Sequence, residues 1–129
     1  MLAKGTFVVK LEPQAPAPVL AKTGLGRMTI DKTFEGDLVA HGLGEMVAFR
    51  AATEGSAGYV AMERVSGVLH GRHGSFALQH DGTMERGHAG LSVRVVPDSG
   101  TDGLAGLRGT MTIEIVGGQH FYAFEYTLP

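Results

Sequence analysis

Hydrophobic and polar residues alternate with a period of two along most of the chain, and Gly, Asp or Pro residues separate the alternating segments. This alternation is typical of β-strands that pack one face against a core. β-Branched and aromatic residues, which favour strands, are frequent in the same segments. No stretch has the sustained periodicity of an amphipathic helix. The pattern therefore predicts an all-β protein.

Eight strands are predicted, most of them joined by short hairpins. They span Lys4–Leu11, Gly24–Phe34, Leu38–Ala48, Gly58–His70, Ser75–His80, Met84–Val96, Leu107–Val116 and Gln119–Leu128. Reversals are expected at Glu35–Asp37 and Arg72–Gly74, and Asp81-Gly82 has the signature of a type I′ turn. Gly87 and Gly90 predict a bulge or a barrel corner in the sixth strand.

Two segments lack the alternation and are predicted to be loops. Glu12–Lys22 contains three prolines, which cannot donate a backbone hydrogen bond to a neighbouring strand. Pro97–Gly106 is polar, and its side chains favour a short helical turn over Thr101–Ala105. We expect this second loop to cap one end of the folded domain.

Eight antiparallel strands form either a closed barrel or a two-sheet sandwich. Glycines inside the predicted strands favour the barrel, because strongly coiled strands need positions without a side chain. These are Gly42, Gly44, Gly58, Gly67 and Gly109. Closure also removes the exposed edges of the sheet. We therefore predict one domain over residues 1–129, an eight-stranded antiparallel up-and-down β-barrel.

Composition excludes several classes of partner and chemistry. Eleven basic and thirteen acidic residues give a net charge of −2, with no basic block that could follow a nucleic-acid backbone. No apolar run is long enough for a membrane helix, and the first residues lack the apolar core of a secretory signal. The absence of cysteine excludes disulfides and thiolate chemistry. We predict a cytoplasmic protein that binds neither nucleic acid nor membrane.

The sequence also resembles a known family. The segments that carry the resemblance are Phe76–Met84, Val96–Thr101, Leu104–Met111 and His120–Leu128, with Gly5-Thr6-Phe7 near the start. They are similar to the bacterial domain of unknown function 3224, whose fold resembles the allene oxide cyclase barrel and, more distantly, dirigent proteins. The resemblance implies an eight-stranded barrel and no established activity. No catalytic motif of the cyclases or dirigent proteins matches, so no residue role is carried over.

Two strands carry residues that predict a ligand site inside the barrel. Tyr59 and Glu63 share one strand face, and the last strand has a histidine and three aromatic residues on one face: His120, Tyr122, Phe124 and Tyr126. A polar group inside such a barrel is desolvated, which perturbs its pKa as general acids and bases require. These six residues are the candidate ligand-binding residues. Glu63 and Tyr122 are the candidate catalytic groups.

The same pattern also fits a purely structural role. If Glu63 and Glu45 lie inside the barrel they need counter-charges, for which Arg27 and Arg64 are available. Aromatic residues commonly fill small cores. A second row, formed by Val39, His41, Leu43, Glu45 and Val47, shares a face that the pattern alone does not assign to the inside or the outside.

Metal and nucleotide motifs are incomplete. The six histidines include no His-x-His pair, and the closest two, His70 and His73, lie across a predicted turn. Gly24–Thr29 begins like a dinucleotide-binding loop but has Thr29 in place of the third glycine and leads into a strand. We predict no metal and no cofactor.

Three hypotheses about function follow. The first is a barrel that binds a small apolar or amphipathic molecule in its lumen. The second is a cyclase-like or isomerase-like enzyme that uses a lumen acid such as Glu63 or Tyr122. The third is a packed, inert barrel whose outer surface forms a homo-oligomer. The sequence leaves open which is correct, whether any reaction is catalysed and which ligand is bound.

Overall fold

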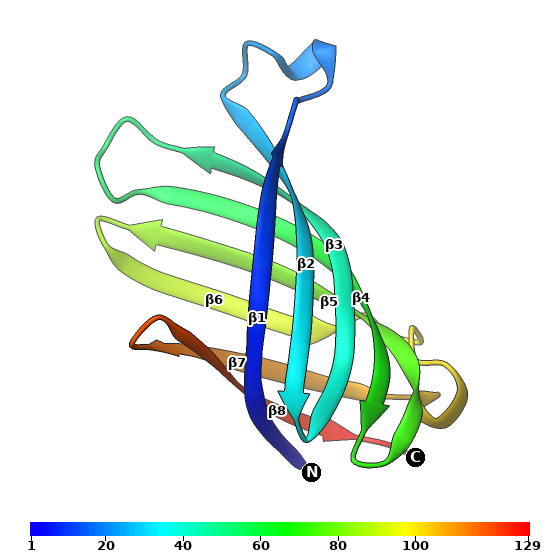
Figure 1. The fold of residues 1–129 in the computed structure, drawn as a ribbon. Helices are drawn as coiled ribbons and strands as arrows, with labels where there is room; N and C mark the ends of the chain where they lie inside the picture. The colour runs from blue at the N-terminus through cyan, green and yellow to red at the C-terminus, as the bar shows by residue number, and fades with distance from the viewer.

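The eight strands pair in chain order and close into a barrel (Figure 1). The computed structural model describes all residues, 1–129. Its strands are β1 (Leu2–Gln14), β2 (Leu25–Gly36), β3 (Leu38–Arg50), β4 (Ala57–Leu69), β5 (Arg72–Glu85), β6 (His88–Val95), β7 (Arg108–Val116) and β8 (Gln119–Thr127). Every pair, including β1 with β8, is antiparallel. The predicted all-β, eight-stranded antiparallel barrel is therefore confirmed.

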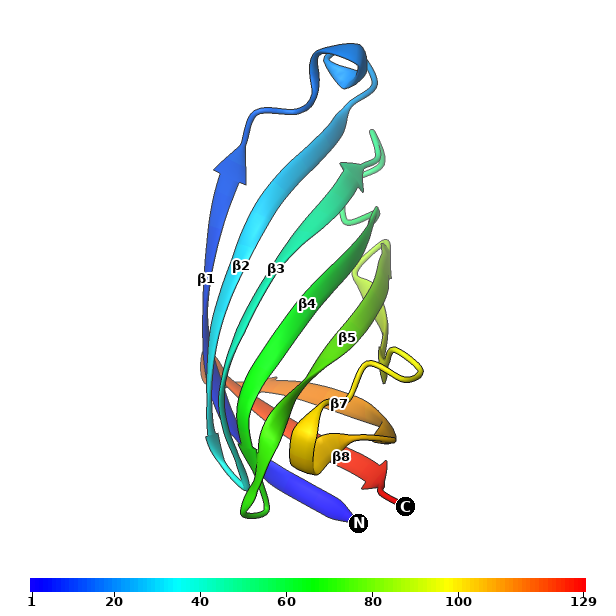
Figure 2. The same ribbon diagram turned by 90° about the vertical axis from the view of Figure 1, so that its right-hand side faces the viewer.

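Two short 3-10 helices lie between strands, η1 (Pro18–Leu20) and η2 (Asp102–Leu104). No helix of the chain has the length and hydropathy that crossing a membrane requires. η2 realises the helical turn expected in the loop before β7. It lies at the same end of the barrel as both termini (Figure 2). Leu104 in η2 and Leu107 after it are fully buried, so this segment plugs that end.

The barrel therefore has two different ends. The plugged end carries the turns at residues 36–37 and 70–71, the segment 96–107 and both termini. The opposite end carries residues 15–24, 51–56, 86–87 and 117–118, and we call it the open end. Each strand therefore runs between the plugged end and the open end.

The turn between β5 and β6 does not lie at the predicted position. Asp81 and Gly82 lie inside β5, where Gly82 pairs with Tyr59 of β4, so the predicted type I′ turn is wrong. A Cβ atom at Gly82 would lie 2.4 Å from Cε1 of Tyr59. This glycine is therefore required by side-chain packing across the strands. The turn instead uses Arg86 and Gly87, whose φ angles are 49° and 91°.

Two neighbouring predictions are also wrong. The reversal before β5 uses His70 and Gly71, with φ angles of 45° and 80°, and Arg72–Gly74 already belongs to β5. No bulge interrupts β6, because its pairing with β5 is continuous from Val95 to His88. Both reversals were expected close to their true places in the chain, but the residues predicted to form the turns lie inside β5.

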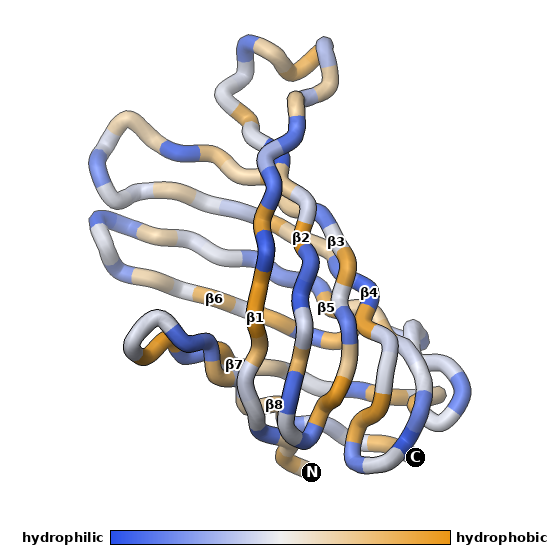
Figure 3. Tube along the Cα trace, in the orientation of Figure 1, coloured by the Kyte–Doolittle hydropathy of each residue, from blue (hydrophilic) through white to orange (hydrophobic).

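Burial alternates along the strands, so alternating positions face the inside and the outside of the barrel. Figure 3 shows the hydropathy of the residues along the same strands. Toward the plugged end the lumen is filled by a hydrophobic core that includes Phe7, Phe34, Leu38, Leu69, Phe76, Leu78, Leu104, Leu107, Tyr122, Phe124 and Tyr126. On β3 the buried positions are Leu38, Ala40 and Gly42. The row containing His41 and Glu45 therefore faces outward.

Toward the open end the inward-facing side chains are no longer covered. Leu11, Met84, Leu91 and Ile115 continue the inward rows of their strands, yet they are 46%, 43%, 44% and 63% exposed. β6 and β7 share only two paired positions, at residues 93–94 and 110–111, and then diverge toward their outer turns (Figure 1). The open half of the lumen therefore presents apolar side chains to solvent.

Candidate functional site

Three ionisable side chains meet inside the barrel, Lys32 from β2, Glu63 from β4 and His80 from β5. Each is at most 4% exposed. Lys32 Nζ donates a hydrogen bond to Glu63 Oε1 over 2.8 Å, and His80 Nε2 contacts the same oxygen at 2.6 Å. One carboxylate oxygen therefore holds both partners. We call these three residues the lumen cluster.

The strand between β2 and β4 makes this contact possible. β3 separates Lys32 from Glu63, and it places Gly42 opposite Lys32. A Cβ atom at Gly42 would lie 2.4 Å from Glu63 Oε2, so only glycine leaves space for the carboxylate at this position. Lys32 Nζ also lies 4.7 Å from the ring centre of Phe7 and 5.5 Å from that of Phe34. The cluster thus rests on the aromatic core, with cation–π contacts beneath the ammonium group.

The cluster is built around an ionised carboxylate. Burial of Glu63 opposes its ionisation, but the hydrogen bond from His80 and the charge and hydrogen bond of Lys32 outweigh burial and hold its pKa below the ordinary value. The neighbouring Tyr59 responds in the opposite direction, since burial and then the negative charges of Glu63 and Asp81 raise the pKa of its hydroxyl. At neutral pH the inward face of β4 therefore carries a carboxylate at Glu63 and a protonated phenol at Tyr59.

Several polar atoms around the cluster have no partner in the chain. Glu63 Oε2 is fully enclosed and accepts no hydrogen bond. His80 bonds through Nε2 alone, and the Tyr59 hydroxyl makes no hydrogen bond within the chain. Buried polar groups are nearly always paired, so unpaired groups inside a lumen mark a place where a further molecule can bind.

The six residues predicted from the sequence all face the inside of the barrel, but at different depths. Glu63 belongs to the lumen cluster, and Tyr59 lies on the same strand face, nearer the open end. His120 is half-buried, with its ring centre 5.0 Å from that of Phe7. Phe124 and Tyr126 belong to the hydrophobic core toward the plugged end.

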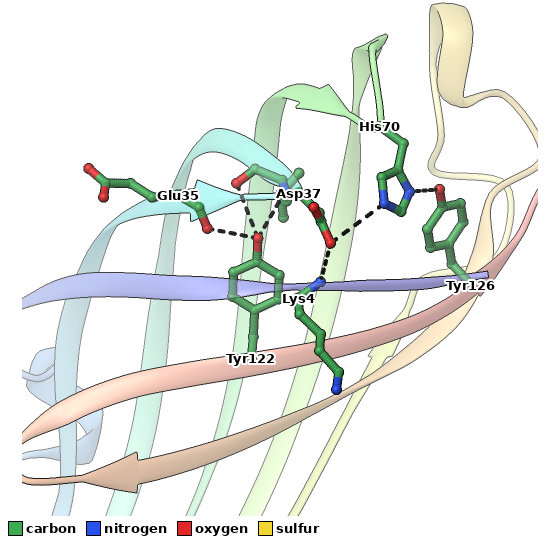
Figure 4. Close-up of polar contacts among 7 residues, drawn as sticks. Lys4, Glu35, Asp37, His70, Tyr122 and Tyr126 are labelled. Carbon is green, nitrogen blue, oxygen red and sulfur yellow. Dashed lines mark hydrogen bonds and ion pairs between the residues drawn. The ribbon is translucent and has the colours of Figure 1, made fainter.

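Tyr122, the second candidate catalytic group, uses its hydroxyl to fasten the turn between β2 and β3. Its oxygen accepts a hydrogen bond from the backbone N–H of Leu38 over 2.9 Å and donates to the carbonyl of Glu35 over 2.9 Å (Figure 4). Burial is the largest influence on this hydroxyl and raises its pKa. The hydroxyl is therefore occupied by the backbone.

Lys32 and His80 are the members of the lumen cluster that sequence reasoning missed. Lys32 lies between Ile30 and Phe34 on the inward face of β2, so strict alternation was the signal that could have identified it. Arg64, the expected counter-charge for a buried glutamate, donates instead to Ser75 Oγ over 3.1 Å.

Arg27, one of the two arginines available as counter-charges, pairs with Glu45. Two hydrogen bonds of 3.1 and 2.9 Å join the guanidinium to the carboxylate. Both side chains lie on the outside of the barrel and are 40% and 46% exposed. This pair therefore belongs to the outer surface and not to the lumen.

A second polar group lies at the plugged end, formed by Asp37, His70 and Tyr126 (Figure 4). Asp37 Oδ2 accepts a hydrogen bond from the backbone N–H of Lys4 over 2.8 Å and lies 3.6 Å from His70 Nε2. His70 Nδ1 is hydrogen-bonded to the Tyr126 hydroxyl. These contacts join the turns at 36–37 and 70–71 to β1 and β8, so they fasten the plugged end.

The outer surface also has hollows. One of about 450 Å³ lies over β1, β7 and β8 and is lined by residues that include Thr6, Thr112, Glu114 and Phe121. It contains no member of the lumen cluster. The buried, partly unpaired ionisable groups therefore make the lumen the better candidate for a functional site.

Comparison with known proteins agrees with the barrel fold and with the resemblance to the domain of unknown function 3224. A crystal structure of a protein with unknown function from the DUF3224 family of Shewanella oneidensis MR-1 superimposes with a TM-score of 0.93 and 50% sequence identity, over 100% of this chain and 97% of that one. No curated protein matches the chain. The family model for proteins of unknown function DUF3224 matches residues 3–126. The chain therefore belongs to the DUF3224 family.

Proposed function

We propose that the protein binds a small apolar or amphipathic molecule in the open half of the barrel lumen. The observation that carries this proposal is the exposure of inward-facing apolar side chains, such as Met84 and Leu91, above a buried ionisable cluster. Binding sites for small molecules are typically concave and mostly apolar, with few polar groups. Tyr59 and His80 supply those polar groups here.

The energetic argument rests on apolar area. Covering apolar surface contributes roughly 25 cal/mol per Å². Four inward-facing side chains at the open end are 43–63% exposed, so a ligand that covers them gains this contribution without displacing the packed core. In the proposal Phe124 and Tyr126 support the floor of the site from below, and His120 contributes to its wall.

A matched pair of variants tests the proposal. Ala48 faces inward opposite Tyr59, and the adjacent Val47 faces outward on the same strand. We expect the neutral dye Nile red to bind the wild-type protein saturably, with its fluorescence enhanced. Ala48→Phe places a ring beside Tyr59 and should abolish this binding, whereas Val47→Phe should preserve it. Equal dye binding by both variants would show that the dye binds the outer surface and would refute the proposal.

The geometry gives less support to an enzyme that uses Glu63 or Tyr122 directly. Glu63 Oε1 is shared by Lys32 and His80, and Oε2 is enclosed against Gly42. The Tyr122 hydroxyl is occupied by backbone groups. Both groups would have to give up existing hydrogen bonds before acting on a substrate.

A homo-oligomer remains a second proposal, and one observation favours it. Leu43, Val60 and Met62 point outward from the adjacent strands β3 and β4 and are 59%, 58% and 52% exposed. Contiguous exposed apolar side chains often mark contacts between proteins. Light scattering after size exclusion tests this proposal. A mass above that of one 13.6 kDa chain supports it, and a single-chain mass at all concentrations contradicts it.

A further inference from the structure

The hydrogen bond between His80 and Glu63 determines which atom of the imidazole is available to a ligand. An ionised carboxylate only accepts hydrogen bonds, so Nε2 of His80 carries the hydrogen that bonds Glu63 Oε1. In the neutral ring Nδ1 then has a free lone pair. Nδ1 of His80 has no hydrogen-bond partner in the chain. Glu63 Oε2 is the only fully enclosed side-chain atom without a partner, so His80 Nδ1 is not fully enclosed and remains accessible. His80 therefore offers one unpaired ring nitrogen.

Tyr59 offers a complementary group on the neighbouring strand. It pairs with Gly82, and His80 lies two positions away on the same face of β5. Such diagonal neighbours lie about 7–8 Å apart at Cα, a separation that aromatic and long side chains can span. The Tyr59 pKa is raised, so its hydroxyl remains protonated and can donate. The two side chains together present two unpaired polar groups.

The charges in the lumen cluster disfavour an anionic ligand. The ammonium of Lys32 is already paired with Glu63 over 2.8 Å and lies against two aromatic rings. The charges of Lys32 and Glu63 therefore compensate each other. A ligand carboxylate near His80 would meet the negative charge of Glu63 at low dielectric, where like charges repel strongly.

We infer that the lumen ligand carries a neutral hydroxyl group, as an alcohol or a phenol does, which forms hydrogen bonds with His80 Nδ1 and with the Tyr59 hydroxyl. A hydroxyl both donates and accepts, so it satisfies both unpaired side chains and adds no charge. This inference rests on the proposed function and names the chemical class of the ligand. Lys32 and Glu63 act as positioning residues, since they hold His80 in the required tautomer.

Three probes with the same ring system test the inference on the wild-type protein: naphthalen-2-ylmethanol, naphthalene-2-carboxylate and 2-methylnaphthalene. Their dissociation constants are measured by fluorescence titration. We expect the alcohol to bind about 3–10-fold more tightly than the hydrocarbon, the range for one or two neutral hydrogen bonds. The carboxylate should bind at least about 10-fold more weakly than the alcohol because of Glu63.

Two variants with the same substitution connect this preference to His80. His80→Leu removes the acceptor and leaves Glu63 paired with Lys32, so the alcohol should lose its advantage over the hydrocarbon. His41 lies on the outer face of β3, and His41→Leu should retain the advantage. The comparison of the three probes on the wild-type protein does not depend on either variant.

The possible failures of the inference and of the proposed function are distinguishable. If either the carboxylate or the hydrocarbon binds as tightly as the alcohol, the neutral-hydroxyl inference is overturned while lumen binding stands. If the alcohol keeps its advantage in His80→Leu, the assignment to His80 is overturned. If no probe binds saturably, the proposed function fails together with the inference.

Discussion

Replacing Glu63 by glutamine removes one charge from the lumen cluster and leaves its shape nearly unchanged. The amide oxygen can still accept from Lys32 and His80, so the main change is an unpaired buried ammonium group. At a separation of 2.8 Å and an effective dielectric of about 20, the lost attraction is about 6 kcal/mol. The retained hydrogen bonds offset part of this loss. We expect Glu63→Gln to lower the free energy of unfolding by about 3–5 kcal/mol, as is usual when one partner of a buried ion pair is removed.

Removing the second charge should restore most of this stability. Lys32→Met keeps an apolar chain against Phe7 and Phe34, where a thioether packs well. The double variant Lys32→Met/Glu63→Gln contains neither buried charge, and His80 keeps an amide acceptor. Apolar replacements of buried ion pairs are often neutral or stabilising. We expect the double variant to lie within about 1 kcal/mol of the wild type.

Urea unfolding followed by far-UV circular dichroism measures these stabilities, because the chain has no tryptophan. Glu45→Gln is the matched control, since Glu45 forms an ion pair with Arg27 on the exposed outer face. It should change stability much less than Glu63→Gln. A Glu63→Gln variant as stable as the wild type would refute a coupled buried pair. So would a double variant whose loss of stability equals the sum of the losses of the single variants Lys32→Met and Glu63→Gln.

Four further predictions are measured by the same unfolding assay. Gly42→Ala should cost about 1–3 kcal/mol through overpacking against Glu63 Oε2, and less in a Glu63→Ala background; equal costs would contradict that contact. Because folding lowers the pKa of Glu63, its stabilising contribution should be present above the ordinary value of 4.5 and be lost as pH falls through the folded pKa; a Glu63→Gln curve with the same acid loss would contradict this. Tyr122→Phe should cost about 1–3 kcal/mol, because it leaves the buried N–H of Leu38 without a partner, and an unchanged midpoint would oppose that role. Leu104→Ala should cost about 2–5 kcal/mol, since this side chain plugs the barrel, and a loss typical of a surface site would contradict the plug.

The barrel was predictable because its topology is local. Consecutive hairpins need only the alternation within each strand and a turn after it, and both are visible in the sequence. The errors arose where one residue type serves two purposes. Asp81-Gly82 has the composition of a hairpin turn, but Gly82 is needed under the ring of Tyr59, and only the pairing of β4 with β5 reveals that need.

The candidate site was only half predictable for a related reason. Tyr59 and Glu63 were recognised because they share a strand face, which is a local property. Lys32 lies between Asp31 and Thr33 and has the composition of an exposed position, and its buried partner Glu63 is 31 residues away. Long-range pairs of this kind depend on strand register, which alternation within one strand does not specify.

The methionines of the chain allow the most direct test of binding in the open half of the lumen. Met46 and Met84 lie on inward rows there, Met62 points outward from β4, and Met111 belongs to the buried core. The measurement is a titration of protein carrying ¹³C-labelled methionine methyl groups with naphthalen-2-ylmethanol, followed by NMR. The account predicts saturable shifts of the Met46 and Met84 methyl signals while the Met62 signal stays in place. Shifts confined to Met62, or no shift of any methionine, would contradict it.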